Sequence, residues 1–167
     1  MIMEDRSLSP ELAEFGDELK IRFAPHLPRM AARMLALLLT ADEPRLSSKE
    51  LLAQLDASAA TVSNMGRLLV QLGIAERTVD PETRRDLFGL RPDAWAGMYR
   101  DSARSMDGIV AALDRQLATD LGDAARARIR DMRNFYAFVG NELPHLATRY
   151  EKWRAGHPGE VFAPPAG

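Results

Sequence analysis

Cysteine is absent from the 167 residues, which excludes disulfides, cysteine-based zinc sites and thiol redox sensing. Long apolar runs are missing too, and the longest, Met34–Leu39, is far too short to span a bilayer. Residues 1–12 also lack the basic-then-apolar pattern of a signal peptide. Together these absences predict a cytoplasmic protein that does not enter a membrane.

Motifs for catalysis or for metal binding are also missing. The three histidines, His26, His145 and His157, are scattered and show neither HxxxH nor HExxH spacing. There is no nucleophile motif, no phosphate-binding loop and no acid pair at a recognisable spacing. An enzyme on a helical scaffold would need a pocket that contains ionisable groups with perturbed pKa values, and the sequence gives no indication of such a pocket. We therefore predict neither enzymatic activity nor a cofactor.

What the chain does contain is the composition of a globular protein, with 46% hydrophobic and 28% charged residues. Its length suits one domain, with or without helical extensions, and is sufficient for a proper core. The net charge of −2 argues against indiscriminate coating of nucleic acid. Residues 45–91 carry seven basic and six acidic side chains, so this stretch is only slightly positive. Affinity for phosphate would depend on where the basic residues lie.

Two helices are predicted before residue 42. The first starts with Ser9 as the cap and Pro10 in the first turn, and it carries apolar residues at helical spacing until Pro25. These residues are Leu12, Phe15, Leu19 and Phe23. A small domain offers little surface to cover this apolar stripe, so the stripe suggests that a partner subunit covers it. The second helix, over residues 28–41, is predicted to be the central core helix.

Two short helices joined by a turn of about four residues follow, which is the helix-turn-helix spacing. Ser47 and Glu50 have the spacing of a capping box, and Ser58 can cap the second helix. That second helix predicts a buried stripe of Val62, Met65, Leu69 and Leu72. Its opposite face carries Ala60, Ser63, Asn64, Arg67 and Gln71. A major groove could accept this face closely and meet hydrogen-bonding groups there.

A β-hairpin is predicted directly after this helix. Gly73 has the position that favours a left-handed backbone at a helix end. Residues 74–79 and 85–90 then resemble two strands around the turn 80–84, which has proline early and arginine at its end. The helix and hairpin together indicate a recognition helix followed by a wing.

After Pro92 the chain is predicted to be helical nearly to its end, with a stop and a new cap at residues 121–123. Apolar residues recur in steps of three and four along the second long helix, and a heptad pattern of that length requires a helical partner. Pro144 should kink or end this helix because proline removes a backbone hydrogen bond. The Pro/Gly-rich tail is expected to fray.

The predicted fold is therefore mostly α (α+β), a winged helix-turn-helix with a small β-hairpin wing and long N- and C-terminal dimerisation helices. We expect an N-terminal dimerisation helix over residues 1–27 and a DNA-binding domain over 28–92. A helical dimerisation region should follow over 93–154, with a flexible tail over 155–167.

The order of these elements resembles the MarR family of bacterial transcription regulators. The residues that carry the resemblance are Ser47–Leu51, Ser58–Ser63, Leu72–Arg77 and the wing residues Asp80–Arg85. It covers residues 28–92 well and the flanking helices in outline. The family commonly has Leu-Thr and a glycine after the wing, where this chain has Leu90–Trp95. Arg85–Phe88 and the Asp93-x-Trp95-x-x-Met98 pattern are similar to the GbsR branch.

The resemblance implies a homodimer that binds a pseudo-palindromic operator in double-stranded DNA, within the nucleoid of the cytoplasm. By position, Ser63, Asn64 and Arg67 are assigned to base edges or nearby phosphates, and Arg84 and Arg85 to the minor groove or backbone. Ser47, Ser48 and Lys49 would clamp phosphate. Ser58, Thr61 and Arg77 complete the expected DNA-binding set.

Several alternatives remain compatible with the sequence. The regulator is expected to be a repressor relieved by a small-molecule effector, whereas a winged-helix module that binds protein instead of DNA would suit the near-neutral charge. Trp95, Tyr99, Phe135, Tyr136 and Tyr150 either form an effector pocket or are ordinary core and interface residues. The arginines at positions 126, 128, 130 and 133 are either a solvated face paired with acids or a second binding surface.

Overall fold

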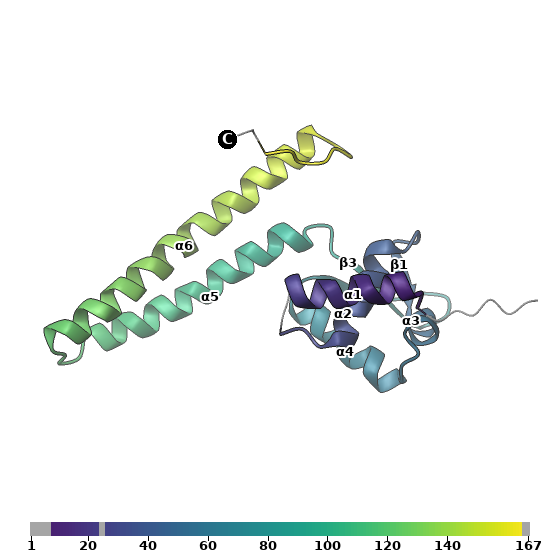
Figure 1. The fold of residues 1–167 in the computed structure, drawn as a ribbon, viewed down its shortest axis with the longest axis horizontal. Helices are drawn as coiled ribbons and strands as arrows, with labels where there is room; N and C mark the ends of the chain where they lie inside the picture. The colour runs from purple at the N-terminus through teal and green to yellow at the C-terminus, as the bar shows by residue number, and fades with distance from the viewer. Residues whose placement is uncertain (1–7, 24–25, 165–167) are drawn as a thin grey trace, which may run out of the picture. The chain divides into compact units, whose positions relative to one another are not determined.

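The computed structural model describes residues 8–23 and 26–164. Its elements are, in chain order, α1 (Pro10–Arg22), α2 (Arg29–Thr40), β1 (Arg45–Ser47), α3 (Ser48–Leu55), α4 (Ala59–Gln71), β2 (Ala75–Val79), β3 (Asp86–Leu90), α5 (Ala94–Leu117) and α6 (Asp123–Gly156) (Figure 1). The chain divides between Ala94 and Trp95 into two compact units, called here the first and the second unit. The predicted winged helix-turn-helix elements all lie in the first unit.

The core of the first unit is built around α2, as predicted. Met34 and Leu35 of this helix are fully buried, and so are Leu51 of α3 and Leu69 of α4. Each of these side chains contributes about 1.5–3 kcal/mol by leaving water. Helix α2 contacts α1, α3, α4 and β3, so the elements around it share one apolar centre.

Helix α1 packs along α2 within the same chain. The two backbones approach closely at Gly16, where an added Cβ would lie 2.9 Å from Cα of Arg33. The Asp17 carboxylate accepts hydrogen bonds from Arg29, with 2.7 Å between Oδ1 and Nε, and from Arg33. These bonds hold the pKa of Asp17 well below its usual range. Even so, Phe15 and Ile21 remain exposed on α1, and so does Phe23 at its C-cap.

The wing belongs to a three-stranded antiparallel sheet in which β3 lies between β1 and β2. Phe88 in the middle strand is opposite Leu46 of β1 and Arg77 of β2. The hairpin itself is confirmed within a residue at each end. Strand β1 was not anticipated, because its three residues end on the capping serine, Ser47, and carry too short a pattern to reveal a strand.

Three predicted N-terminal caps are confirmed, whereas α6 begins after Gly122 with no hydrogen bond from a capping side chain. The side chain of Ser9 accepts a hydrogen bond from the backbone of Leu12, and Ser58 does the same for Thr61. At α3 both halves of the capping box are present: Glu50 N donates to Ser47 Oγ, and Ser47 N donates to Glu50 Oε2 at 2.7 Å. Gly73 has φ of 70°, the left-handed value expected after α4. Local sequence therefore determines where these helices begin and end.

One part of the predicted stripe on α4 is wrong. Val62 and Leu69 are buried and Met65 is half-buried, but Leu72 is 44% exposed. Leu72 is the C-cap residue, where the chain already leaves the helix, and Ile74 is buried instead. The inner face also contains Gly66, which lies against Phe88.

The second unit is an antiparallel pair of helices, α5 and α6, which lie side by side (Figure 1). Arg100 pairs with Glu151 near one end, and Arg133 with Asp114 near the other, with 2.9 Å between Nε and Oδ1. Pro144 does not end α6, which continues to Gly156. Proline removes one backbone hydrogen bond from the helix, but α6 continues past it.

The C-terminal tail has more structure than expected. Ala155 and Gly156 belong to α6, and the Phe162 ring meets Trp153 edge-on with centroids 5.2 Å apart. His157 stacks on the same indole at 5.2 Å. An aromatic cluster therefore joins the described part of the tail to the end of α6.

Within residues 8–23 and 26–164, no helix combines the length and the apolar character that crossing a membrane would require.

Candidate nucleic-acid interface

Helices α3 and α4 form the helix-turn-helix of the first unit. Residues 56–58 connect them, and Asp56 adopts a left-handed φ of 47° in this turn. Ser58 then caps α4 through its side chain, whose oxygen lies 2.9 Å from the hydroxyl of Thr61. Ser58 and Thr61 thus shape the start of the helix, where small residues leave the backbone open to close approach.

The exposed face of α4 is the one that the sequence predicts. Ala60, Ser63, Asn64, Arg67 and Gln71 are all exposed there. The Arg67 guanidinium donates a 3.4 Å hydrogen bond to the Asn64 side chain, so the two polar groups lie together one turn apart. This face presents donors and acceptors of the kinds that pair with base edges.

Arg77 borders the same face from the wing. It lines a small groove of about 110 Å³ together with Ser63, Arg67 and Gln71, and Phe88 also contributes to its wall. Arg77 also forms an ion pair with Asp86 on the neighbouring strand at 2.8 Å, while its side chain stays 55% exposed. The groove joins the recognition helix and the wing into one continuous surface.

The wing turn is organised by Asp80. Its carboxylate accepts hydrogen bonds from the backbone of Glu82 at 2.8 Å and from the hydroxyl and backbone of Thr83. The Thr83 hydroxyl, then the backbone N–H groups, hold the pKa of Asp80 below its ordinary value, and Arg85 adds to this effect. Arg84 adopts φ of 57°, a left-handed conformation that is uncommon for a residue with a side chain.

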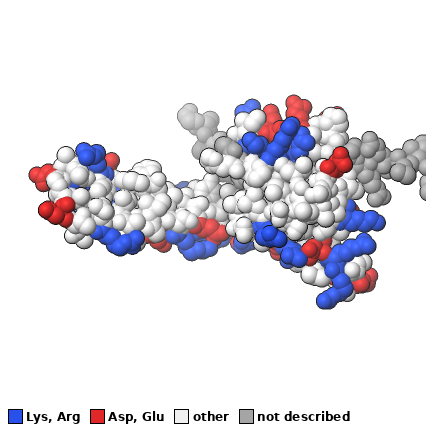
Figure 2. All heavy atoms as spheres, turned by 90° about the horizontal axis from the view of Figure 1, so that it is seen from below, with Lys and Arg blue, Asp and Glu red and all other residues white. Residues whose placement is uncertain are grey.

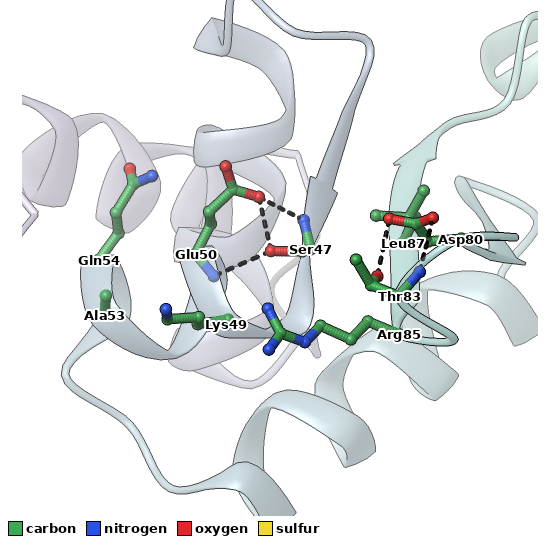
Figure 3. A pocket seen from close by; sticks show the side chains of 9 residues that line it. All are labelled: Ser47, Lys49, Glu50, Ala53, Gln54, Asp80, Thr83, Arg85 and Leu87. Carbon is green, nitrogen blue, oxygen red and sulfur yellow. Dashed lines mark hydrogen bonds between the residues drawn. The ribbon is translucent and has the colours of Figure 1, made fainter.

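A larger groove of about 630 Å³ opens between α3 and the wing turn. Its lining residues are Ser47, Lys49, Glu50, Ala53, Gln54, Asp80, Thr83, Arg85 and Leu87. Figure 3 shows the Arg85 guanidinium reaching from the wing toward α3, where Lys49 extends from the first turn. Glu50 and Asp80 both use their carboxylates in the hydrogen bonds already described. The two cations thus face a groove whose acids are engaged in the protein's own structure.

Ser47 and Ser48 are already engaged within the first unit. Ser47 serves the capping box, and the Ser48 hydroxyl donates a 3.3 Å hydrogen bond to the carbonyl of Asp86. Both stand at the N-terminus of α3, where the helix dipole favours an anion. A phosphate contact by either hydroxyl stays a prediction.

Basic side chains are unevenly placed on the surface. Lys and Arg project together at the edge of the first unit, at the lower right of Figure 2, with acidic atoms among them. Along the helical pair, basic and acidic side chains are mixed. The face of the first unit seen in Figure 2 therefore carries a local cluster of basic side chains.

The second unit contains an apolar cavity of about 360 Å³ between the start of α5 and the last third of α6. It is lined by Trp95, Ala96, Tyr99, Leu146, Ala147 and Tyr150. Trp95 and Tyr99 are thus brought together with Tyr150. Phe135 and Tyr136 are not, because they form a separate edge-to-face pair elsewhere on α6, with centroids 5.6 Å apart.

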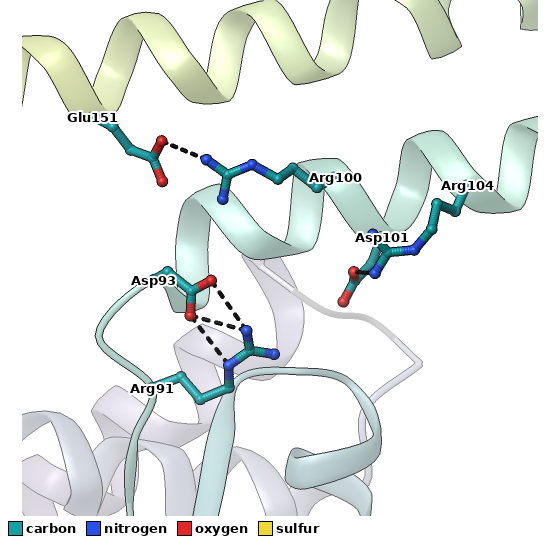
Figure 4. A network of polar contacts seen from close by, with 6 residues as sticks. All are labelled: Arg91, Asp93, Arg100, Asp101, Arg104 and Glu151. Atoms are coloured by element: carbon teal, nitrogen blue, oxygen red, sulfur yellow. Dashed lines mark hydrogen bonds and ion pairs between the residues drawn. The ribbon is translucent and has the colours of Figure 1, made fainter.

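The residues of the ion pair that joins α5 to α6 do not line this cavity. Figure 4 shows the pair of Arg100 with Glu151 between α5 and α6, and the pair of Arg104 with Asp101 along α5. The same figure shows an ion pair between Arg91 and Asp93, with 2.9 Å between guanidinium and carboxylate, in the segment that joins β3 to α5.

The arginines of α6 have structural partners at two of the four positions. Arg126 donates hydrogen bonds to the carbonyls of Leu117 and Thr119, at 2.7 and 3.2 Å, and so caps the C-terminus of α5. Arg133 pairs with Asp114. Arg128 and Arg130 are exposed. No group of three or more metal-ligating side chains occurs in the part of the chain that the structure describes.

Two contributors to this surface were missed in the sequence. Asp80 organises the wing turn, and an aspartate three residues before a threonine in a turn could have revealed it. Gly66 allows α4 to approach β3, but a single glycine inside a helix gives no signal of what lies against it.

Comparisons with known proteins found a family, a relative and a solved structure to which this chain is similar. A family described as MmpR5-like MarR family transcriptional regulator matches residues 93–154. The chain is 34% identical over 154 residues to the HTH-type transcriptional regulator MmpR5 of Mycobacterium tuberculosis (strain ATCC 25618 / H37Rv), covering 90% of this chain and 93% of the relative. A crystal structure described as a transcriptional regulator superposes with a TM-score of 0.76 at 34% identity, covering 86% of this chain and 99% of that one. These matches do not confirm the GbsR branch.

Proposed function

Since the chain belongs to the MarR family of helix-turn-helix transcription regulators, we propose that it acts as a homodimeric repressor on double-stranded DNA. Each recognition helix would enter a major groove of a pseudo-palindromic operator, with the wings at the adjacent minor grooves. An effector held by the second unit would weaken this binding. The protein would act on nucleoid DNA in the cytoplasm.

The observation that carries the proposal is the continuous polar surface from α4 to the wing turn. Ser63, Asn64 and Arg67 occupy its helical part, and Arg77 continues it on β2. Lys49 and Arg85 flank the adjoining groove of about 630 Å³. Groups that can hydrogen-bond to base edges thus lie beside cations that can bind the phosphates of the DNA backbone. DNA recognition uses both kinds of contact, the first for sequence specificity and the second for positioning.

Exposed apolar residues on α1 and α6 support a dimer. Phe135 and Phe138 are 61% and 67% exposed on α6, and Met132 lies on the same side of the helix. Phe15 and Ile21 are exposed on α1, and Phe23 is exposed at its C-cap. Large apolar side chains in such numbers are costly in water, and a second copy would cover them by an isologous contact. Two copies would also double the phosphate contacts available to a module of low net charge.

The apolar cavity of the second unit supports an effector. Trp95, Tyr99 and Tyr150 supply three aromatic rings around about 360 Å³, within the usual size range of ligand pockets. A ligand that binds one arrangement of the two DNA-binding domains more tightly than the other would shift the dimer toward that arrangement. Phe135 and Tyr136, which do not line the cavity, would act in dimerisation instead.

A mobility shift with the DNA upstream of the protein's own gene tests the proposal. Arg67→Ala removes a reading group, and Arg84→Asn removes a wing charge while asparagine still tolerates the left-handed backbone. We expect each to weaken binding by roughly 5- to 100-fold. Arg128→Gln, on the exposed face of α6, is the matched control and should leave binding unchanged. Failure of the wild-type protein to bind at low salt would instead favour a winged-helix module that binds protein.

A further inference from the structure

The recognition helix touches the wing strand at a position where no side chain larger than hydrogen fits. A Cβ added at Gly66 would lie 2.4 Å from Cε1, 2.7 Å from Cζ and 3.0 Å from Cδ1 of Phe88. Contacts this short do not occur between real carbon atoms, so the backbone of α4 rests directly on the phenyl ring. Gly66 is buried and Phe88 is only 2% exposed.

The ring cannot easily yield to an added methyl group. Phe88 lies in the middle strand of the sheet, opposite Leu46 on one side and Arg77 on the other, so its backbone is held by both neighbouring strands. Its ring also contributes to the wall of the small groove that Ser63, Arg67 and Arg77 share. A displacement at this contact would therefore be taken up mainly by α4, and would open the groove between helix and wing.

Glycine at position 66 makes the helix itself less stable. Glycine inside a helix is less favourable than alanine because it loses more backbone freedom on folding. Gly66 is the eighth residue of the 13-residue helix α4 and far from either cap, so no turn requires it. The close approach to Phe88 is the property that only glycine supplies at this position.

We propose that Gly66 and Phe88 are positioning residues for DNA recognition, because their contact sets the spacing between the recognition helix and the wing. Neither residue would itself touch the DNA. The contact holds Ser63, Asn64 and Arg67 at a fixed distance from Arg84 and Arg85, so that base edges and backbone phosphates are engaged together. The effect on DNA rests on the proposed function, whereas the spacing is a property of the protein alone.

The spacing is measured without DNA. Because the chain contains no cysteine, Ser63→Cys and Glu82→Cys introduce two unique sites for spin labels on α4 and the wing turn. Adding Gly66→Ala must relieve a 2.4 Å approach to an ordinary carbon–carbon separation, a movement of roughly 1 Å at the contact. We expect the label-to-label distance, measured by electron spin resonance, to shift or broaden. Gly66→Ala combined with Phe88→Leu, which removes Cε1 and Cζ, should restore the wild-type distance.

DNA binding supplies the second readout. In Gly66→Ala we expect affinity to fall on the order of tenfold, and the slope of log affinity against log salt to become shallower as the wing loses phosphate contacts. The double variant Gly66→Ala/Phe88→Leu should recover both the wild-type DNA affinity and the wild-type slope against salt. Simple destabilisation would lower the amount of folded protein but would leave the salt slope of the folded fraction unchanged.

The outcomes separate this inference from the proposed function. An unchanged label distance in a folded Gly66→Ala protein, or a distance that Phe88→Leu does not restore, overturns the positioning role whether or not DNA binds. A wild-type protein that binds no DNA refutes the proposed function but leaves the distance result standing. If Gly66→Ala does not fold, the Phe88→Leu variant tests the proposal by itself. The distance between the two spin labels should then shorten, because α4 can move toward β3. An unchanged label distance overturns the proposal.

Discussion

Replacing Arg85 by glutamine removes a charge from the groove between α3 and the wing turn while keeping most of the side chain's length. Arg85 is exposed and its side chain forms no hydrogen bond with another described residue, so the fold should be unaffected. The Asp80 carboxylate keeps its bonds to Glu82 and Thr83. Any loss of DNA affinity would then come from the missing cation itself.

The size of the effect follows from counterion release. If each Arg85 neutralises one phosphate, a dimer loses two contacts, and the slope of log affinity against log salt becomes shallower by about 1.8, since each contact contributes about 0.9. Between 50 and 200 mM salt the wild-type protein should therefore lose roughly tenfold more affinity than Arg85→Gln.

Fluorescence anisotropy with labelled operator DNA over that salt range measures both slopes. Lys49→Gln, on the opposite wall of the groove, should produce a similar decrease, and Arg128→Gln on α6 should produce none. Equal slopes for wild type and Arg85→Gln would refute a phosphate contact at this position. A decrease in Arg128→Gln would assign DNA contacts to α6 as well.

Three further predictions concern stability and assembly. Ser47→Ala removes the capping box of α3 and should lower the free energy of unfolding by about 1 kcal/mol in urea titrations. Arg133 holds the pKa of Asp114 below its ordinary value, so this pair stabilises the protein above about pH 4 and loses its contribution as the pH falls further. Thermal unfolding from pH 6 to 3 should show a smaller decrease in Asp114→Asn, and an equal decrease would contradict the pairing. Phe135→Asp with Phe138→Asp should shift the protein toward monomer in analytical ultracentrifugation.

Sequence predicted the fold where the signals are local. Ser9, Ser47 and Ser58 cap helices with their own side chains, and Gly73 takes the backbone conformation that it alone adopts easily. A cap depends on residues within one turn, so one chain segment contains all the information. The exposed face of α4 was predictable for the same reason, since helical periodicity alone separates it from the buried side.

Long-range contacts could not be predicted in this way. The strand β1 exists because β3 pairs with it, and Gly66 is small because Phe88 lies against it. Trp95 and Tyr99 meet Tyr150, rather than Phe135 and Tyr136, because the antiparallel pair sets which turns of α5 and α6 are opposite. No pattern within one helix specifies that register. The same holds for Pro144, whose effect on α6 depends on the packing around it.

In the proposed function, the surface from α4 to the wing reads DNA as part of a dimer. The most direct measurement is the affinity of the wild-type protein for the DNA upstream of its own gene, compared with a shuffled duplex of the same composition at about 150 mM salt. We expect the natural sequence to bind at least about 1,000-fold more tightly, at two protein chains per site. Equal affinity for both duplexes, or no binding to either, would contradict the account.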